Sequence, residues 1–392
     1  MEPEQIENPP VPQPKAIAPE STTAPLEVES TPLFAEAAKP EGPPEPGTFG
    51  WVFSGKNGLR AGWSVALFLP LMMLFSALVG AVFFATHLID ERAEHGGPRT
   101  ALLSEIILLT GLMGAAALVS LLEQRPKNLL AYNLLGPRRG FHFVAGLVAG
   151  FAALALLVGA LHVGGWLTLA SAGLAAPQIA QYALLWGLTF LMVGLYEEGL
   201  FRCYLQATLT RGINLWWALG LEAGMCGWLL WHGKGNGIWG IYAMALLGLA
   251  PCLWLALKKA DSAGFWLAAW VSSTLFGFVH TGNNGENWIG IFAAGAIGFV
   301  FVVSVRLTGS AGWAIGFHAT WDWAETFFFG TADSGMPAVG SFLVAKPAGN
   351  PFWSGGTNGP EGSRLVLGIV LLVLIALVAA YGRKGLCSHE SR

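Results

Sequence analysis

Apolar runs of about 20 residues, separated by short polar connectors, repeat along the chain from residue 61 onward. A helix of about 20 residues crosses the hydrocarbon layer of a bilayer, which is roughly 30 Å thick, and it satisfies its backbone hydrogen bonds internally. The pattern therefore predicts an all-α fold, a polytopic membrane helical bundle of about ten transmembrane helices. The predicted helices lie near 61–86, 101–122, 141–162, 179–209, 213–231, 238–257, 263–281, 288–306, 311–330 and 364–381.

The first 50 residues have a different composition. They hold twelve of the 22 prolines and nine glutamates, with almost no aromatic residues. Such a segment cannot bury enough apolar surface to offset the entropy cost of ordering, so we expect a disordered, cytoplasmic tail over residues 1–50. The segment 331–363 is also rich in proline and glycine, and a loop of that length is typically functional or disordered.

Composition and charge place the chain in a bilayer. Hydrophobic residues make up 54% of the sequence and charged residues 11%. No stripe of basic and aromatic residues is present, so the lipid bilayer is an expected partner and nucleic acid is not. Thirteen lysines and arginines flank one side of the ten predicted helices and five flank the other. Because cytoplasmic loops are enriched in these residues, we predict that both termini are cytoplasmic.

Ionisable residues cluster within one of the apolar runs, at Glu197, Glu198 and Arg202. A charge at bilayer depth costs about 2.5–3.5 kcal/mol on insertion scales, so such residues normally face a protein interior or a wet cavity and indicate function. On a helix, Glu198 and Arg202 are four positions apart and share a face, which allows them to pair. Glu197 points about 100° away, which leaves it available for chemistry.

Two further polar motifs follow along the chain. His280 ends one apolar run, four positions after Phe276, and His318 lies four positions before Asp322 in another. The spacing of His318 and Asp322 suits two ligands of one metal ion, or a histidine oriented by its acid. We interpret Glu222 as a buried acid that is hydrogen-bonded or protonated, and not as a catalytic residue.

Together, three motifs on separate apolar helices resemble those of the CAAX protease and bacteriocin-processing family of intramembrane proteases, also called the Abi family. This family includes the type II CAAX prenyl endopeptidase, and the resemblance extends from about residue 180 to residue 330. The motifs, in chain order, are Glu197-Glu198-x-x-x-Arg202, Phe276-x-x-x-His280 and His318-x-x-x-Asp322.

The resemblance implies a role for each matching residue. Glu197 and His280 would activate the attacking water. His318 and Asp322 would act as metal ligands or stabilise the oxyanion. Glu198 and Arg202 would form a pair that supports the site. Asp322 stands where the family commonly has asparagine, and aspartate would add a ligand charge. Apart from the resemblance, Glu325 follows Asp322 by three positions and shares its face on a helix, which is compatible with a supporting role.

The chain departs from the family in length, because 78 positions separate Arg202 from His280. We interpret the additional residues, about 213–257, as an inserted hairpin of two helices. This segment contains His232, which follows an aromatic-rich run and is an alternative second-motif histidine. We favour His280 because the residues around it fit the family better. The predicted helix ends place Glu197 and His318 in one half of the bilayer and His280 toward the other, and tilted or broken helices around a central cavity would close this gap.

The predicted function is hydrolysis of a peptide bond in a membrane-associated protein or peptide. We expect a divalent metal, most favourably zinc, held by Glu197, His280, His318 and Asp322. The two carboxylates balance its charge, and the two imidazoles are neutral ligands. A metal-free site with His318 as oxyanion donor is the alternative. Other possible functions are a membrane transporter or proton relay, and a non-catalytic immunity or binding protein. We expect a multi-pass protein of a bacterial cytoplasmic membrane, and the sequence predicts no oligomeric state.

The predicted organisation divides the chain into five parts. These are the tail at 1–50, N-terminal transmembrane helices at 51–178, the protease-like core at 179–330 with its extra hairpin, the long loop at 331–363, and the last transmembrane helix with a basic tail at 364–392.

Overall fold

The computed structural model describes residues 50–55, 58–88, 97–123, 138–232, 238–258, 263–283, 285–336 and 339–387. These residues all belong to one compact unit, Leu33–Arg392. The predicted tail over 1–50 lies outside the described residues, apart from Gly50. Several of the lysines and arginines used to predict the orientation also lie outside them, and the orientation stays a prediction.

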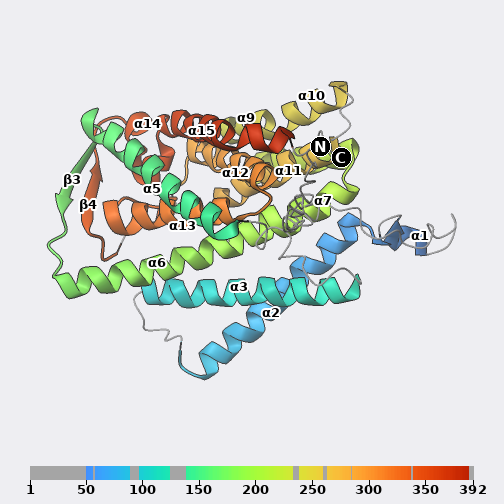
Figure 1. Ribbon diagram of the computed structural model, residues 1–392, viewed down its shortest axis with the longest axis horizontal. Coiled ribbons are helices and arrows are strands. Elements are labelled where there is room, and N and C mark those ends of the chain that lie inside the picture. Colours follow the sequence, from blue (N-terminus) through green and yellow to red (C-terminus); the bar gives the residue numbers. More distant parts are fainter. Residues whose placement is uncertain are drawn as a thin grey trace, which may run out of the picture. The chain divides into compact units, whose positions relative to one another are not determined.

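Helices make up almost all of the described chain, so the predicted all-α membrane bundle is confirmed (Figure 1). In chain order, the elements are α1 (Gly50–Phe53), β1 (Ser54–Gly55), β2 (Gly58–Leu59), α2 (Ala61–Ala85), α3 (Pro98–Leu122), α5 (Arg139–Val163), β3 (Leu167–Ser171), α6 (Ala176–Glu198), η1 (Gly199–Leu205), α7 (Gln206–Gly212), α8 (Leu215–His232), α9 (Ile238–Met244), η2 (Ala245–Leu249), α10 (Ala250–Lys258), α11 (Ala263–Val279), η3 (His280–Gly282), α12 (Trp288–Thr308), α13 (Gly312–Trp323), η4 (Ala324–Phe329), β4 (Leu343–Pro347), α14 (Pro351–Ser354), η5 (Gly356–Asn358), η6 (Pro360–Gly362) and α15 (Leu365–Cys387). Here η1, η2 and η4 are π-helical, and η3, η5 and η6 are 3₁₀ turns.

All ten predicted apolar runs are helical. Eight helices among the described residues are long and apolar enough to cross a membrane. The other two predicted runs correspond to α8, which has 18 residues, and to α13, which has 12 residues before η4 continues it. The chain is an integral membrane protein.

Local signals define where the helices begin and end. At the start of α12, the side chain of Asn287 accepts hydrogen bonds from the backbone N–H groups of Ile289 and Gly290, which otherwise lack partners in the first turn. At its other end, Gly309 has a left-handed conformation, with φ of 75°, which a residue without Cβ adopts at low cost.

Small residues bring α13 close to the neighbouring helix α5. A Cβ atom at Gly146 of α5 would collide with the carbonyl oxygen of Trp313, and one at Gly316 would collide with that of Phe143. Thr320 of α13 also donates a hydrogen bond to the carbonyl oxygen of Leu147, at 2.8 Å. Close backbone approach of this kind is the usual basis of helix packing in lipid, and it holds α13 rigidly against α5.

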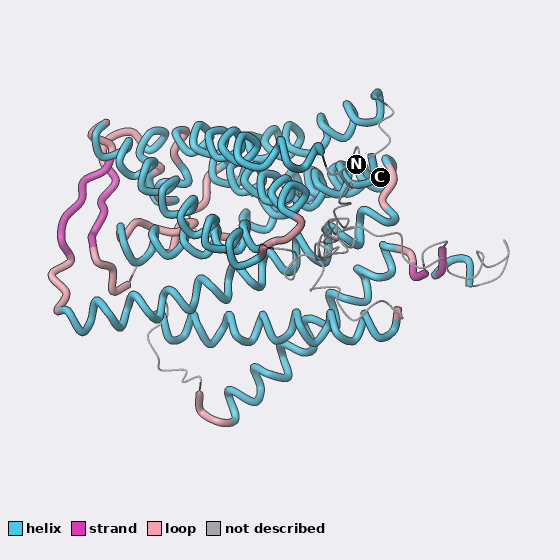
Figure 2. The backbone as a smooth tube through the Cα atoms, viewed as in Figure 1, coloured by secondary structure: helices cyan, strands magenta, loops and turns pink. Residues whose placement is uncertain are grey.

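A β-ribbon was not predicted from the sequence. Strands β3 and β4 pair antiparallel, with Leu167 opposite Pro347 and Ser171 opposite Leu343, and they lie at one end of the bundle (Figure 2). Since β4 belongs to the segment 331–363, that segment is folded where it is described, and β4, α14, η5 and η6 all lie within it. Its ordered structure places it next to the ends of α5 and α13.

The helix that carries Glu197 is longer than predicted. It is continuous from Ala176 to Gly212, which is 37 residues and corresponds to about 55 Å at 1.5 Å per residue. Glu197 lies 21 positions from one end and 15 from the other, so it is near the middle of the helix. Glu197 and His280 line one cavity, so the fold brings together two residues that the predicted helix ends placed toward opposite faces.

The additional residues between the motifs form a helical hairpin, as interpreted from the sequence. It consists of α8 and of the continuous helix α9–η2–α10, and its buried residues pack with Ile291 of α12. Trp228 of α8 contacts the ring of Phe278 of α11, with ring centroids 5.2 Å apart. The hairpin thus covers α11 and α12 from outside and contributes no residue to the cavity described next.

Candidate active site

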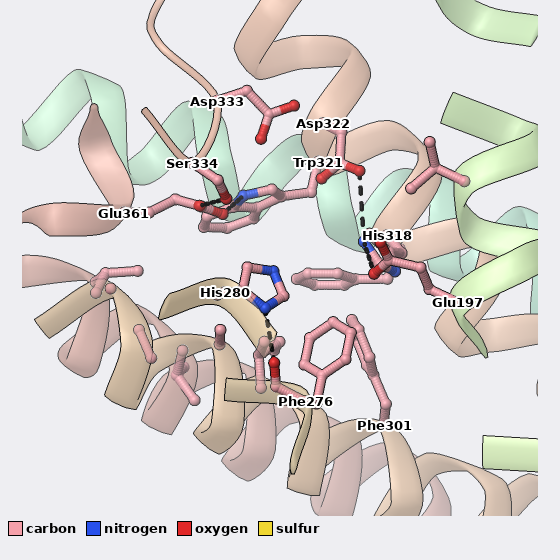
Figure 3. A pocket seen from close by; sticks show the side chains of 18 of the residues that line it. Glu197, Phe276, His280, Phe301, His318, Trp321, Asp322, Asp333, Ser334 and Glu361 are labelled. Carbon is pink, nitrogen blue, oxygen red and sulfur yellow. Dashed lines mark hydrogen bonds and ion pairs between the residues drawn. The ribbon is translucent and has the colours of Figure 1, made fainter. Parts of the chain in front are cut away.

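A cavity of about 250 Å³ lies among the helices, and four of the residues identified from the sequence line it. Glu197 reaches it from α6, His280 from η3 at the end of α11, and His318 and Asp322 from α13 (Figure 3). Three segments that are distant in sequence therefore contribute to one site. Glu198 and Arg202 are not among the lining residues.

Glu198 and Arg202 form the predicted pair behind the cavity. Arg202 Nε lies 3.1 Å from Glu198 Oε2, and their side chains are 1% and 0% exposed. The guanidinium also stacks on aromatic rings, 4.2 Å from the centroid of Phe276 and 5.2 Å from that of Phe301. Burial of both charges with this geometry makes the pair a structural support of the site.

His318 is the centre of the polar network. Its Nδ1 lies 2.9 Å from Glu198 Oε1, and since a carboxylate accepts, the imidazole donates here. Its Nε2 lies 3.4 Å from Asp322 Oδ2 and 3.7 Å from Glu197 Oε2. Glu198 thus orients His318 as well as pairing with Arg202, a contact across 120 positions that sequence reasoning did not find.

Glu197 and His280 are the two groups with freedom to act on a small molecule in the cavity. The side chain of Glu197 is 27% exposed, whereas that of its neighbour Glu198 is fully buried. His280 Nδ1 is 2.7 Å from the carbonyl oxygen of Phe276. A carbonyl only accepts, so Nδ1 carries the proton and the neutral ring keeps its lone pair on Nε2.

The helices that carry Glu197 and Asp322 both change to π-helical geometry within two positions of an acidic residue. The segment η1 begins after Glu198, and η4 begins two positions after Asp322. Single π-helical turns are uncommon and occur frequently at functional sites, because they turn side chains away from the regular helical register.

The sequence patterns did not identify the other polar residues of the cavity wall. Glu105 is the one acidic residue of α3, and its isolation in an apolar helix was the signal that could have identified it. Asp333, Ser334 and Glu361 come from the segment 331–363, where no periodic pattern predicts a position. Burial and the nearby Glu361 raise the pKa of Asp333 to about 7.

The alternative histidine and the other intramembrane acid lie elsewhere. His232 is exposed at the end of α8, where its Nδ1 is 3.0 Å from the carbonyl oxygen of Trp228. Glu222 is buried in the middle of α8. Neither residue lines the cavity, so the structure places His280, and not His232, beside Glu197.

The predicted zinc ligands have suitable donor chemistry, and part of their geometry fits. Zinc bonds of about 2.0–2.2 Å place tetrahedral ligands roughly 3.3–3.6 Å apart, close to the 3.4 Å and 3.7 Å that separate His318 Nε2 from Asp322 and Glu197. The four predicted ligands do not all surround one point. Within the described part of the chain, the acidic residues whose donor atoms all lie within 4.8 Å of one another are Glu325, Asp333 and Glu361. The zinc centre stays a prediction, and no chemical step below depends on it.

Comparison with protein families identifies residues 251–324 as matching the family described as Type II CAAX prenyl endopeptidase Rce1-like. This match supports the assignment of the chain to the CAAX protease family. The match contains His280, His318 and Asp322, and it begins inside the extra hairpin, after the first motif at Glu197. Comparison with curated proteins and with solved structures gave no match.

The match and the fold agree at the level of the family. A polytopic helical bundle with a segment of this kind supports a CAAX-type intramembrane protease, and the cavity lies among the helices that carry the three motifs. The extra hairpin separates the first motif from the matched segment, and the fold brings them together again around His318.

Proposed function

We propose that this CAAX-type protease is an endopeptidase that hydrolyses a peptide bond in a membrane-associated protein or peptide, with Glu197 as the general base. The observation that supports this proposal is the contrast between two adjacent acids. Glu198 is fully buried and holds Arg202 and His318, whereas Glu197 is partly exposed in the cavity. A general base needs access to water and to the substrate, and Glu197 has both.

The proposed reaction starts with a water between Glu197 and His280. Glu197 takes a proton from this water while Nε2 of His280 accepts its other hydrogen bond, and the water oxygen attacks the peptide carbonyl carbon. The resulting oxyanion is stabilised by His318, which donates from Nε2 when its ring is protonated. Glu197 then returns the proton to the leaving nitrogen as the carbon–nitrogen bond breaks.

The remaining wall of the cavity suggests how an apolar substrate segment is held. Phe190 and Val193 of α6, Ile297 of α12, and Ile369 and Val373 of α15 line it. A membrane-associated peptide could place apolar side chains against this wall, and its scissile bond would then face the polar network. The substrate class proposed here rests on this division of the cavity into an apolar and a polar side.

A divalent metal in the cavity is a further part of the proposal. Glu197, His280, His318 and Asp322 are the residues that would hold it. When bound, it would supply a Lewis acid that polarises the substrate carbonyl.

The proposal is tested with purified protein in detergent and a library of membrane-anchored peptides, with products identified by mass spectrometry. Glu197→Gln should abolish cleavage while the protein still accumulates and folds, because the substitution keeps the shape of the side chain. His232→Ala, on the exposed end of α8, is the control and should retain activity. Retention of more than a few per cent of wild-type turnover by Glu197→Gln would exclude Glu197 as the base. Absence of cleavage by the wild type, with ion or substrate flux in liposomes, would favour the transporter alternative.

A further inference from the structure

A second acidic group lies in the cavity wall, apart from the three family motifs. It consists of Glu325 in η4, Asp333 in the following turn and Glu361 in η6. One carboxylate oxygen from each residue lies within 4.8 Å of the other two. Asp333 and Glu361 face the cavity, and Figure 3 shows them on the side opposite Phe276 and Phe301.

Glu325 is the member of this group that indicates a ligand. Its side chain is 0% exposed, and neither carboxylate oxygen has a hydrogen-bond donor of its own, because the indole N–H of Trp321, which interacts with it, already donates to Glu361 Oε1 at 2.8 Å. A buried carboxylate that only shares a donor is costly in a protein interior and more so within a membrane bundle. One of its oxygens is directed at the two other carboxylates, which cannot donate to it when ionised.

Neutral donors hold the other two carboxylates in place. The indole N–H of Trp321 donates to Glu361 Oε1 at 2.8 Å, and the hydroxyl of Ser334 donates to Glu361 Oε2, also at 2.8 Å. Thr326 donates to Asp333 Oδ2 at 3.3 Å. Each oxygen retains a further acceptor position, and such donors are typical of the residues that orient metal ligands.

No cationic side chain balances the group. Within the described residues, no ion pair joins a lysine or arginine to Glu325, Asp333 or Glu361. The backbone passes close by at Gly359, where φ is 86° and a Cβ would lie 3.4 Å from Glu325 Oε1 and collide with the carbonyl oxygen of Ala332. The site is therefore enclosed, acidic and lined with oxygen atoms.

We propose that Glu325, Asp333 and Glu361 hold one hard divalent cation of the calcium type. Calcium takes six to eight oxygen ligands, from carboxylates, carbonyls and water, in flexible geometry. Zinc prefers nitrogen and sulfur donors, which this group lacks. The cation compensates two of the three negative charges and gives Glu325 a partner of its own.

The bound cation has a structural consequence for the catalytic cavity. It ties the segment 331–363, through Asp333 and Glu361, to the helix that carries His318 and Asp322. That segment supplies one wall of the cavity, so the cation positions a wall and not the reacting atoms. This inference goes beyond the proposed peptidase reaction and does not depend on it.

The test measures calcium binding to the full-length protein in detergent after treatment with a chelator. Isothermal titration with calcium should give about one site per chain, and calcium should raise the apparent melting temperature. Glu325→Gln should weaken calcium binding at least about 100-fold, and Ser334→Ala, which removes a donor that orients Glu361, should weaken it about 10-fold or more. Glu222→Gln is the matched control, since Glu222 is also 0% exposed but lies in α8, and this variant should bind calcium as the wild type does.

Terbium provides an independent readout because Trp321 donates directly to a proposed ligand. Excitation of tryptophan should produce terbium emission in the wild type, and Glu325→Gln should lose it. Absence of calcium binding in the wild type would overturn the proposal, as would binding that survives both Glu325→Gln and Ser334→Ala. Binding that disappears in His318→Ala and persists in Glu325→Gln would place the ion at the catalytic network and would also overturn it. Peptide cleavage is measured separately, so neither result can be confused with a failure of the proposed function.

Discussion

Replacement of Glu198 by glutamine tests the buried support of the site. The substitution keeps the size of the side chain and its ability to accept a hydrogen bond, but it removes the negative charge 3.1 Å from Arg202 Nε. Arg202 keeps its stacking on Phe276, and its charge remains at a position that is 1% exposed. We therefore expect Glu198→Gln to destabilise the protein as well as reduce its activity.

The magnitude follows from the distance between the two groups. At 3.1 Å and an effective dielectric constant of about 20, the Coulomb energy of the pair is about 5 kcal/mol. Mutational experiments on buried pairs give about 3–5 kcal/mol when one partner is removed. A loss of about 4 kcal/mol from the free energy of unfolding corresponds to a decrease of roughly 10 °C in melting temperature for a protein larger than 200 residues.

The assay compares thermal unfolding and protein yield in detergent for matched variants. Glu197→Gln makes the same chemical change one position away, at a side chain that is 27% exposed, and should cost no more than about 1 kcal/mol. The double variant Glu198→Gln/Arg202→Met should recover at least half of the loss, because replacing both charges with neutral groups leaves no uncompensated buried charge.

Two results would refute this reasoning. The first is an unfolding free energy of Glu198→Gln within about 1 kcal/mol of the wild type, which would mean that the pair contributes no more than a surface ion pair. The second is equal destabilisation by Glu197→Gln and Glu198→Gln, which would mean that the two acids do not have the different environments described above.

The remaining predictions concern the second motif, the metal and the orientation. His280→Ala should abolish peptide cleavage and His232→Ala should preserve it; the reverse result would transfer the role to the hairpin histidine. If zinc is bound, a chelator should abolish peptide cleavage and added zinc should restore it. Asp322→Asn should then lower the zinc content measured by elemental analysis. Cleavage by a preparation without stoichiometric metal would exclude the zinc centre. Reporter fusions at the two termini should both give a cytoplasmic signal, and a signal outside from either one would contradict the charge pattern.

Local spacing predicted the contacts that lie within one helix. Glu198 with Arg202, and His318 with Asp322, are pairs four residues apart, and both pairs are in contact in the structure. Apolar run length likewise predicted every membrane helix, because the bilayer imposes a minimum length on each one. These features depend only on helical geometry and on the thickness of the membrane.

Contacts between distant segments could not be predicted in the same way. The bond from His318 to Glu198 depends on the close packing of α13 against α6, which hydrophobic patterns do not specify. Glu361 and Asp333 lie in a segment rich in proline and glycine. Its hydrophobic residues follow neither the helical period of 3.6 nor the strand period of 2, so the sequence does not indicate where these side chains point. The joint position of Glu197 and His280 in one cavity likewise depends on how their helices pack, which the predicted helix ends do not specify.

The helical hairpin between the first two motifs begins and ends at positions that lie close together, so it could be excised. Gly264, just after the hairpin, would bring a Cβ within 3.1 Å of the carbonyl oxygen of Thr210, just before it, and Gln206 Nε2 donates to the carbonyl oxygen of Phe265 at 3.2 Å. The two ends therefore meet, and a short linker from Gly212 to Ala263 could replace 213–262. In water, such an excision would expose the apolar faces of α11 and α12, but in a bilayer lipid tails would take the place of the hairpin at little cost. We therefore expect the chain to tolerate, in a membrane, a large change in architecture that would destabilise a soluble protein.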